Sequence, residues 1–396
     1  MKINITENIY GLDIKDLISV GYRVNNNKRN FLFISKLLGK HIEVKPDICK
    51  ATGFLLASII LGRTNETSKI IKYINSKDNN IDVKEAMELT YRTNEKLVVL
   101  GFAETATALG MSVASSIENS YYITTTRENI DWIEPFVKFE EEHSYSTTHK
   151  CFPEDQYRLK EADRIILVDD EITTGKSMLN IIKELKRKTG IKKYSILTIL
   201  DWRNLGCKNL YKDFIRKNKV EIEVSSLISG EIEVEDNKIY YDKEIDFLDE
   251  RVNIKSINVI SKKNRYFKYS GIFGVDFEDI KKIEEECLKS ANKIQEIIGK
   301  NKKILVLGHG ENIYIPSRIA SYLEGDVYFK STTRSPIYCS NEKGYLINEK
   351  SGFYHKDVKY YLYNKSEIED LYDKVILITD DDLNIKLTNN MIIVRP

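Results

Sequence analysis

The sequence has no Cys-x-x-Cys pair and no strong excess of charge of either sign. Its five cysteines are scattered along 396 residues, which fits reduced thiols in a cytosol and argues against a zinc site. Sixty-one basic and 60 acidic residues leave a net charge of +1, so no global field recruits nucleic acid. The absence of a helix-turn-helix-like segment or a strongly basic arm also argues against a DNA-binding regulator.

Long apolar runs are missing too. The first ten residues contain no apolar core of a signal peptide. The longest apolar stretch, near residues 54–61, is far too short to span a bilayer. We therefore expect a cytoplasmic protein with no membrane partner. The length predicts two or three domains, and a composition of 42% apolar and 31% charged residues is typical of a soluble protein.

The most informative stretch is RIILVDDEITTGKS, residues 164–177. A buried strand over 165–168 is followed by a polar loop and then by apolar residues at helical spacing. The polar residues are Asp169, Asp170, Glu171, Thr173, Thr174, Gly175, Lys176 and Ser177. Amides and hydroxyls at the start of a helix suit a monophosphate. The carboxylates suit sugar hydroxyls or Mg²⁺, bound by Asp169 and Asp170 indirectly through ribose or water.

This stretch has two other interpretations. A Walker A loop needs a glycine five residues before Gly175, and Asp170 occupies that position, so this interpretation is rejected. A strand-to-helix turn with solvated acids stays open as the alternative.

A second loop follows the predicted strand over 97–100. Gly101 allows a tight turn, and five residues lead into a helix: Ala103, Glu104, Thr105, Ala106 and Thr107. Most of them are small, so the backbone can approach a ligand closely. Alone the pattern is weak, but it lies sixty-odd residues before the acidic loop.

Two further stretches offer charged or titratable groups. Arg127 ends the strand-like YYITTTR, and arginine is a natural bidentate partner for phosphate. An edge-strand salt bridge is the alternative. The polar segment 136–151 has no apolar periodicity, and Glu142, His143 and His149 within it could supply a proton donor or acceptor. Incidental surface histidines are nearly as well supported.

Three residues are candidates for binding a second substrate. Asp201 and Trp202 follow the predicted strand over 194–200, where the indole could stack on a planar base and the carboxylate could accept from it. Core packing is the favoured alternative for Trp202. Lys36 lies in a basic cluster within 21–46, which could contact a base or pyrophosphate or could form a solvated basic face.

The chain contains an internal repeat. Residues 303–335 resemble 96–128 without a gap at an offset of 207. Further on, 374–382 echoes 164–171 but lacks TTGK, so it cannot build the same phosphate loop. We expect 1–260 to form one domain and 261–396 a degenerate copy of it, with chance similarity as the alternative. Within the second part, residues 276–299 predict an amphipathic helix with Asp276 as its N-cap.

These motifs resemble type I phosphoribosyltransferases, and Thr173 is closer to the orotate type than to the hypoxanthine type. More specifically, NKRNFLFISKLLGKH, GFAETATALG, VDDEITTGKS and LDWRN resemble the orotate-phosphoribosyltransferase-like family of tellurite-resistance-type gene clusters. That family has a C-terminal domain named for Thr-Arg-Ser-Pro, which stands here at 333–336. Ser177 replaces the usual threonine and keeps the hydroxyl. The resemblance implies an α/β type I fold, a parallel sheet flanked by helices, with a second, degenerate α/β domain.

The resemblance also implies an activity, the Mg²⁺-dependent transfer of a phosphoribosyl group from phosphoribosyl pyrophosphate (PRPP) to a nucleobase-like acceptor. The ribose would bind Asp169 and Asp170, the 5′-phosphate 173–177, and the pyrophosphate 103–107 with Arg127. The segment 136–151, with Glu142, His143 and His149, lies where related enzymes carry a mobile loop that closes over the site. Asp169, Asp170 and Arg127 would act in catalysis. The product would be a nucleoside-like metabolite, made with partner enzymes of one biosynthetic module. A non-catalytic PRPP sensor or scaffold is the alternative, and the sequence leaves open the acceptor and whether the chain forms a homodimer.

Overall fold

The computed structural model describes residues 2–26, 29–62, 67–76, 81–140, 148–233, 238–242, 245–251, 257–263, 265–300 and 302–395. By its internal contacts the chain divides into two compact units. Unit 1 comprises Met1–Asp13, Cys49–Val234 and Tyr269–Lys281, and unit 2 comprises Ile14–Ile48, Glu235–Lys268 and Lys282–Pro396. Both units are therefore discontinuous in sequence, and the single boundary expected after residue 260 stays a prediction.

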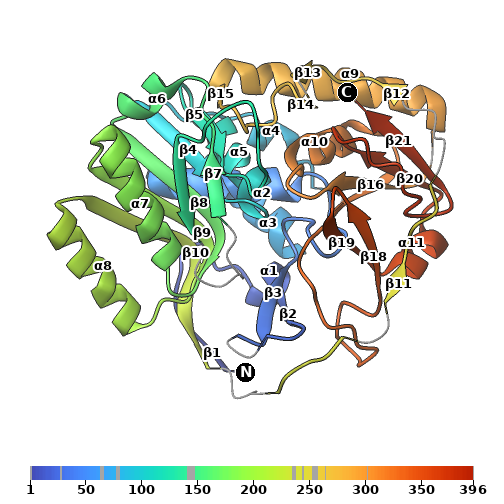
Figure 1. Ribbon diagram of the computed structural model, residues 1–396, viewed down its shortest axis with the longest axis horizontal. Helices are drawn as coiled ribbons and strands as arrows, with labels where there is room; N and C mark the ends of the chain where they lie inside the picture. The colour runs from blue at the N-terminus through green and yellow to red at the C-terminus, as the bar shows by residue number, and fades with distance from the viewer. Residues whose placement is uncertain are drawn as a thin grey trace. The chain divides into compact units, whose positions relative to one another are not determined.

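Unit 1 is built on a seven-stranded sheet in the spatial order β1-β10-β9-β8-β4-β5-β15 (Figure 1). Its strands are β1 (Lys2–Asn8), β4 (Leu97–Gly101), β5 (Tyr121–Thr124), β8 (Arg164–Ile172), β9 (Lys193–Asp201), β10 (Glu221–Glu233) and β15 (Val275–Asp276). The strands from β10 to β5 are parallel, and β1 and β15 are antiparallel at the two edges. A hairpin of β6 (Val137–Glu140) and β7 (Thr148–Cys151) completes the strands of this unit.

The helices described in unit 1 are α2 (Ile48–Ile60, whose first residue belongs to unit 2), α3 (Ser68–Ser76), α4 (Lys84–Met87), α5 (Ala106–Ser115), α6 (Gln156–Lys160), α7 (Lys176–Thr189) and α8 (Leu205–Asn218). Helix α5 packs against β4, β5 and β8, and α7 and α8 run beside β8 to β10 (Figure 1). The apolar run 165–168 of β8 is fully buried, as expected for a parallel strand covered on both faces. The apolar face predicted for α7 is buried as well.

Unit 2 contains a smaller parallel sheet in the order β12-β21-β20-β16-β17. Its strands are β12 (Ile257–Asn258), β16 (Lys303–His309), β17 (Asp326–Thr332), β20 (Lys374–Ile378) and β21 (Met391–Arg395). The remaining strands of the unit are β2 (Ile18–Tyr22), β3 (Phe31–Ser35), β11 (Asp246–Phe247), β13 (Lys262–Lys263), β14 (Tyr266–Phe267), β18 (Lys350–His355) and β19 (Val358–Tyr363). Strands β18 and β19 form a hairpin beside β11, and β2 pairs with β3 and β13 with β14.

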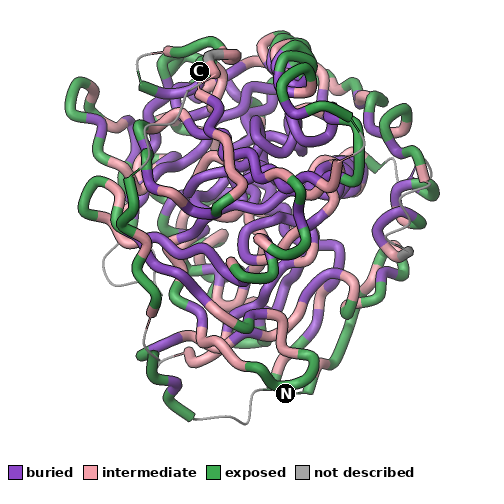
Figure 2. Tube along the Cα trace, turned by 90° about the vertical axis from the view of Figure 1, so that its right-hand side faces the viewer, coloured by how far each residue is buried: buried purple, intermediate pink, exposed green. Residues whose placement is uncertain are grey.

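The described helices of unit 2 are α1 (Ile14–Leu17), α9 (Phe277–Ile298, whose first turn belongs to unit 1), α10 (Tyr314–Tyr322) and α11 (Lys365–Leu371). The helix predicted over 276–299 is confirmed as α9, and Oδ1 of Asp276 accepts from the N–H of Asp279 at 2.8 Å, as an N-cap does. Buried residues form the central strands of both sheets. Buried segments of the chain are coloured purple in Figure 2. No helix in the described part of the chain has both the length and the apolarity to cross a membrane.

The two units repeat one topology. The order β9-β8-β4-β5 in unit 1 corresponds to β21-β20-β16-β17 in unit 2, and the β6–β7 hairpin corresponds to β18–β19. The next strand differs, because β10 follows β9 in the chain whereas β12 precedes β16. Thr126 and Thr333, which are related by the repeat offset, each form a bridge to the second strand of their hairpin, at Lys150 and Tyr361. Unit 2 has no helix between β20 and β21, where residues 379–390 are all described. It therefore lacks the counterpart of α7, consistent with the loss of TTGK from its sequence.

The repeat extends to the segments that border β5 in unit 1 and β17 in unit 2. Each of these two segments leads into a helix of the other unit, so we call this an exchange of edge segments. In unit 1 the carbonyl of Gly271 accepts from the N–H of Thr124 at 3.0 Å, and in unit 2 the carbonyl of Gly39 accepts from the N–H of Ser331 at 2.7 Å. The segment around Gly39 leads into α2 of unit 1, whereas the segment around Gly271 leads into α9, most of which belongs to unit 2. The segment that borders the edge of each sheet thus leads into a helix that belongs wholly or mostly to the other unit.

Candidate active site

The acidic residues 169–171 lie inside β8, which extends to Ile172. We predicted a loop directly after Val168, but the backbone pairing with β9 continues past the acids. All three acidic residues are partly exposed. The N–H of Asp170 donates to Oδ1 of Asp169 at 3.0 Å. The carboxylates therefore stand at the carboxyl edge of the parallel sheet, where ligands bind in such folds.

Gly175 makes the turn between β8 and α7. Its φ of +72° is left-handed, a conformation that side chains disfavour. A Cβ atom there would lie 2.2 Å from the hydroxyl oxygen of Tyr211, which donates a hydrogen bond to the carbonyl of Gly175 at 2.8 Å. Burial raises the pKa of Tyr211 above its ordinary value, so the phenol stays a donor at neutral pH. Both backbone conformation and space therefore require glycine at this turn.

The residues before Gly175 complete the turn, and the residues after it begin the helix. Thr173 and Thr174 form the turn, and Lys176 and Ser177 start α7. Because the N-cap is a glycine, no side chain at that position caps the helix. The first turn of a helix carries N–H groups without intrahelical partners, and here they lie at the same sheet edge as the acidic residues.

The loop after β4 lies beside the end of β8. The N–H of Phe102 donates to the carbonyl of Val168 at 3.1 Å, and the N–H of Ala103 donates to Oγ1 of Thr125 at 2.9 Å. The peptide bond between Ala103 and Glu104 is cis. A Cβ at Gly101 would lie 2.6 Å from the carbonyl oxygen of Ala106, so the turn into α5 requires glycine. Residues 103–107 and the acidic residues of β8 thus follow neighbouring parallel strands.

Arg127, Glu104 and His149 form a cluster next to this loop. The Glu104 carboxylate is buried and makes no hydrogen bond within the described structure, but its Oε2 lies 3.7 Å from Nη1 of Arg127. Nε of Arg127 donates to Nε2 of His149 at 3.4 Å, and Nδ1 of His149 lies 3.1 Å from Oγ1 of Thr125. The structure therefore brings Arg127 to the loop 103–107, as the sequence suggested.

The predicted mobile loop, residues 136–151, differs from the structure at both ends, because residues 137–140 form strand β6 and residues 148–151 form strand β7. His149 lies in strand β7, not in a loop, and its side chain is buried. Its ring packs against Phe139, with centroids 5.1 Å apart. Glu142 and His143 lie outside the described residues. The sequence concealed this strand because it is only four residues long and mostly polar.

The residues predicted to bind the acceptor have internal partners. Asp201 forms a buried ion pair with Arg203, whose Nε and Nη2 donate at 2.9 and 2.7 Å. Burial alone would lower the pKa of Arg203, but this carboxylate raises it above the ordinary value. Trp202 is only 5% exposed. Lys36 belongs to unit 2, where its ammonium donates to the carbonyl of Lys15 at 2.7 Å. A base would therefore have to compete with Arg203 for Asp201.

Comparison with known families decides what this arrangement belongs to. Residues 17–231 match the family described as phosphoribosyl transferase. The chain belongs to the phosphoribosyl transferase family. Residues 269–394 match the TRSP domain found C-terminal to that family's domain, so the predicted family and domain architecture are confirmed. No curated protein sequence matches this phosphoribosyl transferase family member.

Solved structures of phosphoribosyltransferases also align with this family member. The adenine enzyme from Rhodothermus marinus is 15% identical, with 53% of this chain and 94% of that chain covered and a TM-score of 0.28. The orotate enzyme from Mycobacterium tuberculosis is 12% identical, with 53% and 89% covered and a TM-score of 0.26. The adenine enzyme from Trypanosoma brucei is 19% identical with a TM-score of 0.24, and the alignment covers 34% of this chain but only 56% of that chain.

The carboxylates of β8 suit a magnesium ion by their chemistry, because Mg²⁺ prefers oxygen ligands and usually keeps several waters. Asp169 and Asp170 are partly exposed and offer such oxygens. The only described group of three side chains close enough to hold an ion lies elsewhere, so protein ligands alone would not enclose Mg²⁺ at β8. The residues fit an ion that is shared with a bound substrate.

Two residues at the site were missed by sequence reasoning. Thr125 joins the loop 103–107 to His149 through its hydroxyl, and Tyr211 fixes the turn at Gly175 from α8. The signal for Thr125 was present, because TTR recurs in both copies of the repeat. Tyr211 has no local signal, since only tertiary packing brings α8 to the turn.

Proposed function

We propose that this protein is a phosphoribosyltransferase that moves a 5-phosphoribosyl group from PRPP to a nucleobase-like acceptor, within the biosynthesis of a nucleoside-like metabolite. One observation carries the proposal. The acids of β8, the Gly175 turn and the loop 103–107 meet at the carboxyl edge of one parallel sheet, where the N–H of Phe102 bonds to the carbonyl of Val168.

The phosphoribosyl group would bind along β8 and its turn. The 5′-phosphate, a dianion, would be held by the amides and hydroxyls of 173–177 at the N-terminus of α7, where the helix dipole favours negative charge. The ribose 2′- and 3′-hydroxyls would donate to Asp169 and Asp170. Carboxylates are acceptors only, which fits hydroxyls and disfavours a phosphate at the same position.

The pyrophosphate would lie on the loop 103–107, next to Arg127. As the C1–O bond breaks, the bonding electron pair leaves with the pyrophosphate, and C1 gains oxocarbenium character. The acceptor nitrogen then forms its bond to C1 with inversion and loses its proton. Arg127 and the loop amides oppose the charge on the leaving group, which is the stage at which electrostatic stabilisation counts most. Alignment of PRPP and the acceptor in the site would account for much of the remaining rate enhancement.

Mg²⁺, when bound with PRPP, would neutralise charge on the pyrophosphate. Asp169 and Asp170 would hold it indirectly, through ribose or water. Within the chain, the buried Glu104 carboxylate restrains the side chain of Arg127, because its Oε2 lies 3.7 Å from Nη1 of that residue. That contact orients the guanidinium beside the loop where the pyrophosphate would bind.

Calorimetric titration with PRPP and Mg²⁺ is the first test. We expect the wild type to bind and an Asp169→Asn/Asp170→Asn double variant to lose binding. Asp213→Asn is a matched control, because this carboxylate lies on the exposed surface of α8, and it should bind like the wild type. Absence of binding by the wild type, with and without a panel of bases, would contradict the proposal.

The role of Arg127 is tested by the rate of pyrophosphate release in the presence of an accepted base. Removal of one charge-stabilising group costs on the order of 10²–10³ in rate, so we expect Arg127→Ala to lower kcat/KM by at least that factor. Arg127→Lys should recover part of it. PRPP binding with no pyrophosphate release from any base would instead favour the sensor hypothesis, in which the site binds without chemistry.

A further inference from the structure

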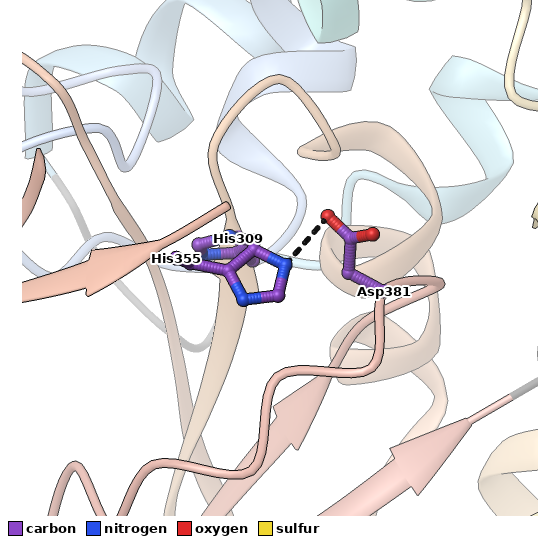
Figure 3. A group of neighbouring side chains, drawn as sticks. All are labelled: His309, His355 and Asp381. Carbon is purple, nitrogen blue, oxygen red and sulfur yellow. Dashed lines mark ion pairs between the residues drawn. The ribbon is translucent and has the colours of Figure 1, made fainter. Parts of the chain in front are cut away.

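Two histidines and an aspartate converge in unit 2. His309 is the last residue of β16, His355 is the last residue of β18, and Asp381 follows β20. Each offers one ligand atom, and the three atoms lie within 4.8 Å of one another. Figure 3 shows the His355 ring beside His309, with a ring nitrogen directed at the Asp381 carboxylate. We propose that these three side chains bind a divalent transition-metal ion, with Zn²⁺ as the reference ion.

The separation between His355 and Asp381 suits two ligands of one ion. Nε2 of His355 lies 3.3 Å from Oδ2 of Asp381. Ligands about 2.0–2.1 Å from a tetrahedral Zn²⁺ stand roughly 3.3 Å apart. The other separations, at most 4.8 Å, shorten to this value when the side chains rotate toward a shared ion.

His309 is prepared as a ligand by its second nitrogen. Nδ1 lies 2.8 Å from Oγ1 of Thr332, which fixes the ring orientation, as a second partner commonly does for metal-binding histidines. Nε2 is buried and has no hydrogen-bond partner in the described structure, and the residue is only 5% exposed. A buried polar atom without a partner is costly, and a metal ion would satisfy it.

The donor set indicates the kind of ion. Imidazole nitrogen suits Zn²⁺, Fe²⁺, Co²⁺ and Ni²⁺, whereas Mg²⁺ and Ca²⁺ prefer oxygen. Three protein ligands leave at least one coordination position for water or a substrate atom. The scattered cysteines argue only against a zinc site with cysteine ligands, and this group contains no cysteine.

The internal repeat accounts for the position of this cluster. At the offset of 207, His309 occupies the position of Phe102 in unit 1. Asp381 follows β20 where Glu171 stands in β8, as judged from the pairing of each strand with its neighbour. The second copy lost its phosphate turn but kept polar groups at the carboxyl edge of its sheet, where ligands bind in α/β folds.

Lys356 opposes a metal ion at this site. Its ammonium pairs with Oδ1 of Asp381, so an incoming cation must displace it. Lys356 and Asp357 have φ of 48° and 61° and connect β18 to β19 as a two-residue turn, a conformation that favours asparagine. Lys356→Asn therefore removes the competing charge with a residue suited to the turn. We expect it to tighten metal binding, and misfolding cannot produce that result.

The test uses the full chain, stripped with a chelator, dialysed and titrated with Zn²⁺ against a chromogenic chelator. Cobalt absorption spectra report nitrogen ligation independently. We expect one tight equivalent per chain, retained by Asp169→Asn/Asp170→Asn. Thr332→Val should weaken binding by about 10–100-fold, as the loss of a hydrogen bond that orients a metal ligand does, and His355→Ala and Asp381→Asn by at least about 100-fold. Asp370→Asn is the matched control, since that carboxylate is exposed on α11, and it should bind normally.

Three results would overturn the proposal. They are the absence of a tight equivalent in the wild type, unchanged affinity in both His355→Ala and Asp381→Asn, and weaker binding by Lys356→Asn than by the wild type. None of them bears on PRPP binding in unit 1, because the variants concern different side chains.

Discussion

Replacement of Gly175 by alanine should cost more stability than the same replacement of Gly190. The two glycines cap opposite ends of α7 and have nearly equal backbone conformations, with φ of 72° and 79°. A left-handed conformation costs a residue with a side chain about 1–2 kcal/mol. At Gly190 a new Cβ would meet no atom within 4 Å. We therefore expect Gly190→Ala to lower the free energy of unfolding by about 1–2 kcal/mol.

At Gly175 the same backbone cost applies, and a steric conflict adds to it. The new Cβ would lie 2.2 Å from the Tyr211 hydroxyl oxygen, so the phenol must move and give up its bond to the carbonyl of Gly175. A lost hydrogen bond of this kind costs about 0.5–1.5 kcal/mol, and more if a buried group is left unsatisfied. We expect a total of about 2–4 kcal/mol from the two terms.

The assay is urea unfolding of the two alanine variants, of Tyr211→Phe, and of the Gly175→Ala/Tyr211→Phe pair. Contacting residues couple by about 0.5–3 kcal/mol, so the double variant should be more stable than additivity predicts. PRPP titration is the functional readout: Gly190→Ala should bind normally, and Gly175→Ala should bind more weakly. Equal stability losses at the two glycines, together with additivity, would refute the account of the turn.

Three more predictions follow from particular residues. Asp170→Asn should lower kcat/KM by about 10²–10³, measured as pyrophosphate release, because the ribose would lose a charged acceptor at the site of transfer. Asp201→Asn should cost about 3–5 kcal/mol in a denaturant titration, since it leaves the buried Arg203 guanidinium without its counter-charge, whereas the wild-type value would show that the pair is dispensable. Burial raises the pKa of Cys151 to about 12, so at pH 8 only about one thiol in 10⁴ is the reactive thiolate. Iodoacetamide should label it only after unfolding, and rapid labelling of the native protein would contradict this.

Much of the fold of unit 1 could be read from the sequence, because its parallel strands are short apolar runs bounded by polar residues. The runs 97–100 and 165–168 correspond to β4 and β8, and the helical spacing after Gly175 corresponds to α7. Element ends were less predictable. The acids of β8 were placed in a loop, since isolated carboxylates favour turns, but the ladder with β9 overrides that preference.

The sequence could not show the partners of single polar side chains. Asp201 was a candidate acceptor-binding group, but its neighbour Arg203 folds back onto it, and nothing in the local pattern indicates that. The group in unit 2 was missed because His309, His355 and Asp381 are far apart in the chain and belong to a copy that the sequence presents as degenerate. The sequence did contain one indication of this group, because the repeat offset aligns His309 with Phe102, which lies at the site of unit 1.

The exchange of edge segments has a consequence for synthesis on the ribosome. When residue 260 has emerged, the sheet of unit 1 still lacks β15, and residues 14–48 have no second sheet to join. Domains that are continuous in sequence can fold one after the other during translation, but here both units must wait for later residues. We therefore expect a chain truncated at 260 to expose an unpaired strand edge and to aggregate.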